Sequence, residues 1–417
     1  MDRTLTASRT RLVVTLLVWV CLGVCIYSIA DDSLAQWDFQ VYYSAAHAFV
    51  SGENPYRPIH PHPELKGDLI FQYPPLTLYL FKWTTLLSLA AAKQVWLCLK
   101  LAALGLLAWI WHKDFERLDV SWPSAIFIAL GLNSALLRDF VSGNISTFEE
   151  LGIWFGFSLL VRNRPYAAAV VLACVAQFKL LPAALLALIP LVRPRDGWKP
   201  LAVGCALYVG LLALNQPFSP DLTHNYLAQF TSANLRMDDR GINNPGSLAM
   251  FRDVIDLTSF MPGLDYNRQS GTIAYYAYLA ALVLILIRTG WNKRAALRTV
   301  DPRLLVYLGC AVYSIAMPRM KDYSYILMLI PTLWIIRDLG ARKITPDYLL
   351  IALGLMVCAQ PQQSKVPGLA GLVYMLQAYL PLLIAAAVAA YLLVDGIKER
   401  AAPASGHPEP LESERLR

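Results

Sequence analysis

The chain has 417 residues, of which 57% are hydrophobic and 16% are charged, and its mean hydropathy is +0.45. This composition is typical of a polytopic membrane protein and excludes a soluble globular domain. The formal net charge is +7, but the Lys and Arg residues cluster in short segments between apolar runs. Such clusters orient membrane helices, so the charge does not indicate nucleic-acid binding, and no nucleic-acid motif is visible.

The first apolar run, residues 12–30, follows three arginines and offers only a weak signal-peptide cleavage site. We therefore expect a retained first helix with a cytoplasmic N-terminus. All seven cysteines fall inside apolar runs, where Cys behaves as a small hydrophobic residue. We predict no disulfides and no thiol chemistry.

A membrane span needs roughly 20 apolar residues, and shorter runs are tolerated among other helices. Another apolar run begins at Pro74, but a crossing there would put basic segments such as HKDFER and RNRP on the wrong side. We predict an interfacial or re-entrant helix at that run, with both termini in the cytoplasm. The remaining runs predict about twelve spans, at 12–30, 94–111, 122–137, 145–161, 166–178, 180–192, 201–214, 272–287, 304–317, 323–336, 348–359 and 372–394.

This topology places two long loops on the outer face, at 31–73 and 215–271, and we expect both to lie over the active site. Four short turns share that face, namely RDFVSGN, QFKLLP, MPRMKD and QPQQSKVPG. We predict one all-α integral-membrane domain over residues 1–398, with interfacial helices in the first outer loop. Residues 399–417 are polar and Pro-rich, which predicts a disordered cytoplasmic tail.

The segment DFQVYYSAAHAFVSGENPY, in the first outer loop, predicts an amphipathic interfacial helix. Asp38 projects with Tyr42, Ala45 and Phe49, away from both stripes of the helix and toward other parts of the protein. The alternative role for Asp38 is the N-cap of this helix. Gly52 and Pro55 predict its end. The apolar stripe consists of Phe39, Tyr43, Ala46 and Val50, and the polar stripe of Gln40, Ser44, His47 and Ser51.

Six blocks occur along the chain in the order DFQVYYSAAHAFVSGENPY, FQYPPLTLYL, VSGNISTFEELGIWF, AQFKLLPAALLALIPLV, NPGSLAMF and MPRMKDYSYILMLIP. Together they resemble glycosyltransferase family 87, whose members have the GT-C fold. The similarity runs from about Trp37 to Pro331. It implies a polyprenyl-phosphate sugar donor, a hydroxyl acceptor on a lipid or envelope glycan, and an active site at the outer face of the bacterial inner membrane. It also implies transfer of a hexose, with mannose as the family default, and Asp38 as the general base.

Transfer from a sugar phosphate needs one base, because the phosphate leaves without protonation by a second carboxylic acid. A single in-line displacement inverts the anomeric configuration. The leaving phosphate needs positive charge nearby, and four basic residues stand where the positive-inside rule disfavours them. The candidates are Arg319, Lys321, Lys179 and Arg138. The structural alternatives are the ion pairs Arg138–Asp139 and Lys321–Asp322, and a Lys179 side chain that snorkels to the interface.

We expect further outer-face residues to contact the substrates. An interfacial aromatic belt is the alternative for the tyrosines, and helix capping is the alternative for Asn144. Family members often carry a His in the block KDYSY, where this chain has tyrosines, so His224 is a candidate substitute. Ser247 predicts the start of a short helix whose free N–H groups would suit a phosphate or a sugar hydroxyl. The substrate-binding set is Tyr42, Tyr43, Gln72, Tyr73, Asn144, Glu149, His224, Asn243, Asn244, Asp322 and Tyr323.

His60 and His62 have a poor spacing for chelation, so we predict no metal site and no cofactor, and leave dependence on a divalent metal open. The expected partners are the donor, the acceptor and membrane lipids. Two other functions compete: a flippase, polymerase or other transporter for lipid-linked glycans, and a scaffold subunit of an envelope complex. A transporter should show a charged path at the membrane midplane and repeated halves, and neither is evident here.

Overall fold

The computed structural model describes residues 3–60, 68–118, 121–236, 241–258, 268–297, 299–340, 346–355 and 369–396. Within these ranges the regular structure is helical, apart from one β-bridge between Ile59 and Leu69. The expectations for His62, Cys358, the turn QPQQSKVPG and the tail 399–417 lie outside the described residues.

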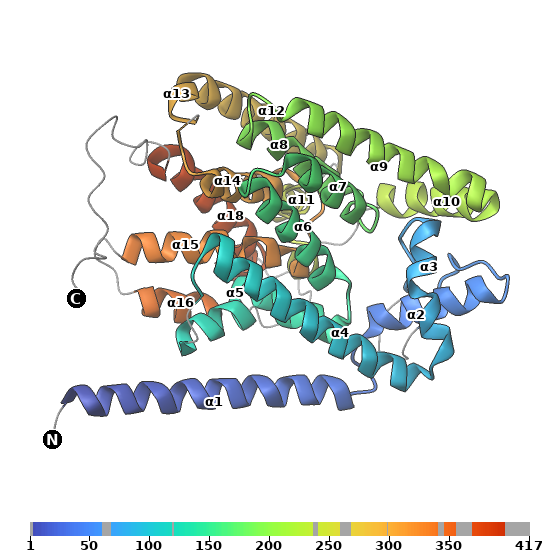
Figure 1. Cartoon of the computed structure of the whole chain (residues 1–417), viewed down its shortest axis with the longest axis horizontal. Helices are drawn as coiled ribbons and strands as arrows, with labels where there is room; N and C mark the ends of the chain where they lie inside the picture. The colour runs from blue at the N-terminus through green and yellow to red at the C-terminus, as the bar shows by residue number, and fades with distance from the viewer. Residues whose placement is uncertain are drawn as a thin grey trace, which may run out of the picture.

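The helices form one bundle, shown in Figure 1. Several are interrupted or preceded by short 3-10 or π-helical turns, as in residues 75–86 around α3. In chain order the helices are α1 (Arg3–Asp31), α2 (Trp37–Val50), α3 (Leu78–Phe81), α4 (Leu89–Ile110), α5 (Trp122–Ser142), α6 (Ser146–Val161), α7 (Pro165–Val175), α8 (Leu188–Val192), α9 (Trp198–Phe218), α10 (Pro220–Arg236), α11 (Ser247–Thr258), α12 (Arg268–Asn292), α13 (Arg294–Leu297), α14 (Pro302–Ala316), α15 (Leu329–Gly340), α16 (Pro346–Leu355), α17 (Leu369–Ala378) and α18 (Leu380–Tyr391).

The protein is a multi-pass membrane protein by the length and apolar character of its helices. A bent pair, Gly371–Ala378 with Leu380–Val394, forms a further span if it counts as one helix. Shorter apolar helices lie at other predicted spans, such as Pro165–Val175 and Pro302–Ala316, and the total of about twelve stays a prediction. Five described helices are long and apolar enough on their own to cross a membrane: Leu12–Asp31, Leu89–Phe115, Trp122–Ser142, Trp198–Phe218 and Gln269–Asn292.

The described elements between α1 and α4 gather at one end of the bundle (Figure 1). In Figure 1, α1 runs along one side of the molecule, and α2 and α3 lie beyond its C-terminal end. The run after Pro74, expected as an interfacial or re-entrant helix, forms short consecutive helical turns between Pro75 and Leu86, and its position relative to the membrane stays a prediction. The helix α2 ends at Val50 and is followed by Gly52 with a φ of +75°, as the sequence predicted.

One face of α2 departs from the predicted pattern. Gln40, expected on the polar stripe, is buried, whereas Val50, expected on the apolar stripe, is exposed. Tyr42 and Ala45 are buried, which agrees with the prediction that the side of α2 bearing Asp38 faces other protein. The reason for the difference is that α2 packs against protein on more than one side, and the two-stripe prediction assumed water on one side and lipid on the other.

A buried ion pair joins α4 to α5. The Lys100 ammonium donates to Asp139 Oδ2 at 2.6 Å, and the two side chains are 1% and 0% exposed. The same ammonium donates to the backbone carbonyls of Asp139 and Asn144, at 2.6 and 2.7 Å. A buried charge is stable only with such partners, because desolvation costs several kcal/mol per ion. The expected alternative pair of Asp139 with Arg138 is therefore wrong.

We expect Lys100→Met to destabilise the protein by about 3–5 kcal/mol, because the substitution leaves the Asp139 carboxylate buried without its cation. Lys82→Met is the matched control. Lys82 is exposed, so its replacement should change stability by less than about 0.5 kcal/mol. Thermal unfolding of both variants in detergent measures the difference. Equal effects of the two substitutions would contradict the structural role of the pair.

Candidate active site

Asp38 is the second residue of α2, and its carboxylate is held by α5–α6 rather than by its own helix. The residue before the helix is Gln36, with φ of 62° and no side-chain capping bond, so the N-cap alternative for Asp38 is wrong. Asp38 Oδ2 instead accepts a hydrogen bond from Asn144 Nδ2 at 2.7 Å. A position in the first helical turn still favours a negative charge at Asp38.

The turn between α5 and α6 places Asn144 against the start of α2. Gly143 ends α5 with a φ of +70°, and a Cβ at this residue would lie 2.8 Å from the Cβ of Gln36. Only glycine combines this backbone conformation with so close an approach. The Gln36 N–H also donates to the Val141 carbonyl at 2.7 Å. The chain from Val141 to Asn144 is thereby fixed to the residues just before Asp38.

Hydrogen bonds at both the oxygen and the nitrogen of its amide fix the orientation of the Asn144 side chain. Its Oδ1 accepts from the Ser146 backbone N–H and hydroxyl, at 3.2 and 2.9 Å, while its Nδ2 donates to Asp38. The contact with Ser146 agrees with the predicted role of Asn144 at the start of a helix, and its contact with a sugar stays a prediction. Because the Oδ1 is occupied by donors, the amide is oriented with its NH2 group toward the Asp38 carboxylate.

The carboxyl group of Asp38 has an elevated pKa. The pKa is raised from 3.8 to about 6, chiefly by burial and to a smaller extent by the nearby Asp139 charge. The Asn144 hydrogen bond and the positive charges of Lys321 and Lys100 oppose this rise. The side chain is still partly exposed, so a substrate can reach it. A carboxylate with this pKa takes up a proton close to neutral pH more readily than an ordinary Asp.

Two buried phenols lie beside Asp38. The Tyr42 and Tyr73 hydroxyls are 2.9 Å apart and hydrogen-bonded, and their rings are 5.5 Å apart. Burial and the Asp38 charge raise the pKa of each phenol well above 10, so both remain neutral donors. Tyr323 lies in the same group, because it interacts electrostatically with Asp38 and Tyr42.

The four predicted basic residues lie around this group, and Lys179 and Arg138 each pair with a carboxylate. Lys179 Nζ pairs with Glu149 Oε2 at 2.5 Å and donates to the Ser146 hydroxyl at 2.6 Å. It also lies 5.2 Å from the centre of the Tyr323 ring. Lys179 is thus tied into the protein, which favours a structural ion pair over a side chain that snorkels to the interface. Snorkelling would carry the ammonium to the membrane interface, away from such partners.

Arg138, near the C-terminal end of α5, forms an ion pair with Asp322. The pair connects α5 to the turn that follows α14. The other two basic residues belong to that turn and are partly exposed. Lys321 acts on the Asp38 carboxylate and Arg319 on Tyr323 through their charges. The turn is held by the segment just before α11, since Asn244 Oδ1 accepts from the Met320 N–H at 3.0 Å.

The remaining predicted residues do not join this group. Gln72, His224 and Asn243 are exposed and have no side-chain partner in the described part of the chain. Tyr43 faces the other side of α2, where its hydroxyl donates to the Leu87 carbonyl at 3.0 Å and its ring contacts His47. For metals, His60 and Asp68 form an exposed pair at 3.3 Å, and no group of three candidate ligands occurs among the described residues.

Several residues that hold the site in place were not predicted from the sequence. The Lys100 ammonium donates to the Asn144 backbone carbonyl, and the Thr147 hydroxyl donates to the Asp139 carboxylate. Glu150 is buried with one carboxylate oxygen unpartnered. A signal for Lys100 existed, because a lysine in the middle of a predicted membrane span is a functional or structural marker by default. The arrangement as a whole can accept a proton at Asp38 and attract a phosphate at the surrounding cations.

Comparison with known proteins gives one family match. The model of glycosyltransferase family 87 matches residues 71–318, more than half of the chain. No curated protein matches the sequence. Among solved structures, ArnT from Cupriavidus metallidurans bound to undecaprenyl phosphate is similar over 91% of this chain and 77% of its own, with 15% identity and a TM-score of 0.43. The apo structure of the same ArnT covers the same shares with 12% identity and a TM-score of 0.40. On the strength of the family match, the chain belongs to glycosyltransferase family 87.

Proposed function

We propose that this glycosyltransferase moves a hexose, with mannose as the family default, from a polyprenyl-phosphate sugar to a hydroxyl of a lipid or envelope glycan. The reaction takes place at the outer face of a bacterial inner membrane, within a GT-C fold, and inverts the anomeric configuration. The observation that carries this proposal is the partly exposed Asp38 carboxylate, whose pKa is raised to about 6 and which lies among cations and neutral phenols.

In the proposed reaction the acceptor hydroxyl loses its proton to Asp38. As the acceptor oxygen forms its bond to the anomeric carbon, the bond from that carbon to the phosphate oxygen breaks, and polyprenyl phosphate leaves with the bonding electrons. Asn144 keeps the carboxylate in position, because it holds one oxygen at 2.7 Å and leaves the other for the acceptor. The tyrosine hydroxyls are suited to donate to sugar oxygens.

The leaving phosphate gains a second negative charge, which the basic turns would stabilise. Lys321 and Arg319 are the first candidates, since both act electrostatically on the Asp38 group. Lys179 and Arg138 bind Glu149 and Asp322, and a phosphate near them would add to or displace those carboxylates. Because the charges of Lys321 and Arg319 act on Asp38 and Tyr323, we place phosphate contact first at the turn after α14.

We expect Asp38→Asn to lower sugar transfer by at least about 100-fold, because an amide cannot accept the acceptor proton. Asp68→Asn is the matched control, since Asp68 is an exposed carboxylate of the same loop. The assay supplies purified protein in proteoliposomes with polyprenyl-phosphate mannose and a mannoside acceptor. An Asp38→Asn protein with near wild-type transfer would sink the mechanism. Movement of the lipid-linked sugar across the bilayer without any transfer product would favour the flippase alternative.

The same carboxyl group predicts the pH dependence of the enzyme. Asp38 must be deprotonated to act as a base, so the transfer rate should rise with pH through about 6 and level off above it. Below that value the rate should fall by about tenfold per pH unit. A rate that is flat between pH 5 and 7, as a group with an ordinary Asp pKa near 3.9 would give, contradicts the assignment.

Stability should change with pH in the opposite direction. The folded-state pKa of Asp38 is above that of the unfolded chain, so the contribution of this group to stability is fully present below about pH 4 and is lost as pH rises through about 6. Asp38→Asn removes this loss. The variant should therefore gain thermal stability relative to wild type between pH 4 and 7, which unfolding scans in detergent measure. A variant that loses stability over this range contradicts the raised pKa.

A further inference from the structure

The turn after α14 lies against a short segment of the chain from another part of the sequence. The turn consists of residues 317–321, between α14 and the 3-10 turn that begins at Asp322, and it belongs to no helix. Irregular backbone has no hydrogen-bond ladder of its own, so other parts of the protein have to hold it. Residues 244–247, with the sequence NPGS, provide this hold just before and at the start of α11.

Two side chains of the 244–247 segment bind the turn near its two ends. The Ser247 hydroxyl donates to the Met317 carbonyl at 3.1 Å, and Asn244 Oδ1 accepts from the Met320 N–H at 3.0 Å. Asn244 and Ser247 are both buried, so these hydrogen bonds are sheltered from water. The backbone of the turn is therefore fixed to the segment on either side of Arg319.

Gly246 brings the backbone of the segment into contact with the middle of the turn. A Cβ at Gly246 would lie 2.9 Å from the Pro318 carbonyl oxygen and 2.9 Å from the Met320 nitrogen. Both neighbours are backbone atoms, so any side chain at this position would push the turn away. The Tyr325 hydroxyl, which follows the turn, donates to the Pro245 carbonyl at 2.8 Å and adds a further link.

The 244–247 segment is itself anchored to other helices. The Gly241 N–H donates to the Tyr379 hydroxyl at 3.1 Å, and this hydroxyl donates to Asp253 Oδ2 at 2.5 Å. Tyr379 lies at the bend between α17 and α18, and Asp253 belongs to α11. The segment therefore has a position of its own, to which the turn is held.

The burial of the turn restricts its two cations. Met320 is 2% exposed and belongs to the hydrophobic core, whereas Arg319 and Lys321 on either side of it are partly exposed. Lys321 acts on Asp38 and Arg319 acts on Tyr323 through their charges. A hold on the Met320 backbone limits the positions of both cations, because they are its immediate neighbours in the chain.

We propose that Asn244 and Gly246 are positioning residues for the donor phosphate, which act through the turn after α14 and not by contact with a substrate. The inference rests on the proposed function, in which Arg319 and Lys321 meet that phosphate. It replaces the substrate contact that the sequence suggested for Asn244. Cations that are already in place need no rearrangement when the phosphate binds, so loss of the hold weakens donor binding and spares acceptor binding.

Steady-state kinetics test the role of Asn244. Asn244→Ala should raise the KM for polyprenyl-phosphate mannose by about fivefold or more, the effect of one lost hydrogen bond, and leave the KM for the mannoside acceptor unchanged. Asn215→Ala is the matched control, because Asn215 is also buried and its Oδ1 accepts from the Leu76 N–H at 2.9 Å. The control should leave the donor KM as in wild type. An unchanged donor KM in Asn244→Ala, or an equal rise of both KM values, overturns the inference.

Gly246→Ala tests the same hold by crowding. The added methyl group displaces the turn, so the donor KM should rise by about tenfold or more. Gly210→Ala is the matched control, since a Cβ at Gly210 meets no atom within 4 Å outside its own helix. A wild-type donor KM in Gly246→Ala overturns the inference, and Asn244→Ala decides the matter if Gly246→Ala does not fold.

The pH profile separates a positioning role from general support of the fold. The positive charge of Lys321 lowers the pKa of Asp38, so a released turn should let this pKa rise. The midpoint of the rate–pH curve of Asn244→Ala should therefore lie above the wild-type value of about 6. A wild-type midpoint in Asn244→Ala overturns the positioning role. The other ionisable groups that interact with Asp38 are Asp139, Lys100, Tyr42, Tyr73 and Tyr323.

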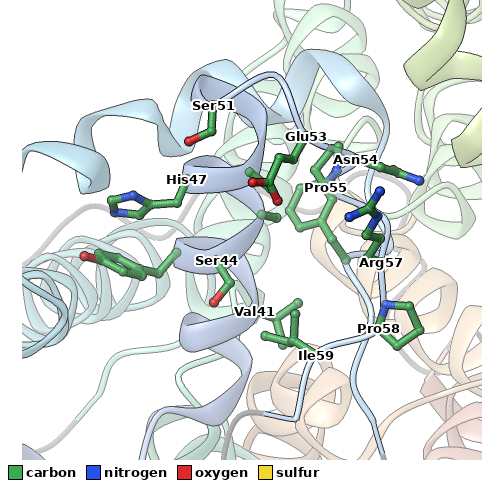
Figure 2. Close-up of a pocket in the computed structure, with 14 residues that line it drawn as sticks. Val41, Ser44, His47, Ser51, Glu53, Asn54, Pro55, Arg57, Pro58 and Ile59 are labelled. Carbon is green, nitrogen blue, oxygen red and sulfur yellow. The ribbon is translucent and has the colours of Figure 1, made fainter.

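A binding measurement separates this inference from the proposed function. Equilibrium binding of radiolabelled undecaprenyl phosphate to the full chain in detergent micelles needs no catalysis. Asn244→Ala should raise the Kd by about fivefold or more. Arg57→Ala removes an exposed cation from the groove beside α2 in Figure 2, away from the turn, and should leave the Kd as in wild type.

The two proposals then fail in different ways. Weaker binding to Asn244→Ala supports the inference even if wild type transfers no sugar, a result that refutes the proposed transfer alone. Absence of binding to wild type, or equal Kd values for wild type and Asn244→Ala, overturns the inference whatever the transfer assay gives.

Discussion

The candidate site depends on one buried cation, the Lys100 ammonium. It bonds three oxygen atoms, two of Asp139 and one of Asn144, and thereby fixes the end of α5 against α4. Asp139 Oδ2 also accepts from the Thr147 backbone N–H at 3.2 Å, which ties in the start of α6. Asn144 lies between these two contacts and holds Asp38. The position of the Asp38 carboxylate therefore depends on the Lys100 ammonium, which acts through Asn144 and forms no hydrogen bond with Asp38 itself.

Each hydrogen bond of this buried network counts, because two of its neighbouring oxygens, Asp139 Oδ1 and Gln36 Oε1, are buried without a partner in the ranges that the structure describes. Gly143 is needed so that the α5–α6 turn can approach Gln36, and the left-handed conformation of Gln36 is the counterpart of that approach. The result is an Asp38 carboxylate whose burial raises its pKa while one fixed hydrogen bond keeps it oriented. Burial and orientation are the two properties that a general base requires.

Much of this arrangement could be predicted from the sequence because it depends on periodicity. Helical projection of residues 38–50 set Asp38 apart from the solvated stripe, and Tyr42 and Ala45 on the same side are buried. The alternative ion pair Arg138–Asp139 was wrong, and helix geometry alone argues against it. Adjacent residues on a helix do not face each other. The actual partners, Asp322 for Arg138 and Lys100 for Asp139, lie 184 and 39 residues away. Pairings across helices depend on packing that no local pattern records.

The N-cap alternative failed for a related reason. Local propensity favours Asp as a cap, but the contact of Gln36 with the α5–α6 turn moved the helix start and gave the Asp38 carboxylate a partner 106 residues away. Lys100 could have been noticed as a charge in an apolar span, although its three acceptors could not have been assigned without the fold.

The helix α2 fixes the spacing between the proposed base and one of the neighbouring phenols. Asp38 is in its first turn, and Tyr42, one turn later, is hydrogen-bonded to the Tyr73 hydroxyl at 2.9 Å. Because a helix keeps its residues at a rise of about 1.5 Å each, Asp38 and Tyr42 keep one spacing along the axis. Under the proposed function the base and this phenol lie on one rigid element, whereas the donor phosphate would be recognised by turns from other helices. A substitution in those turns would then change donor binding without moving the base.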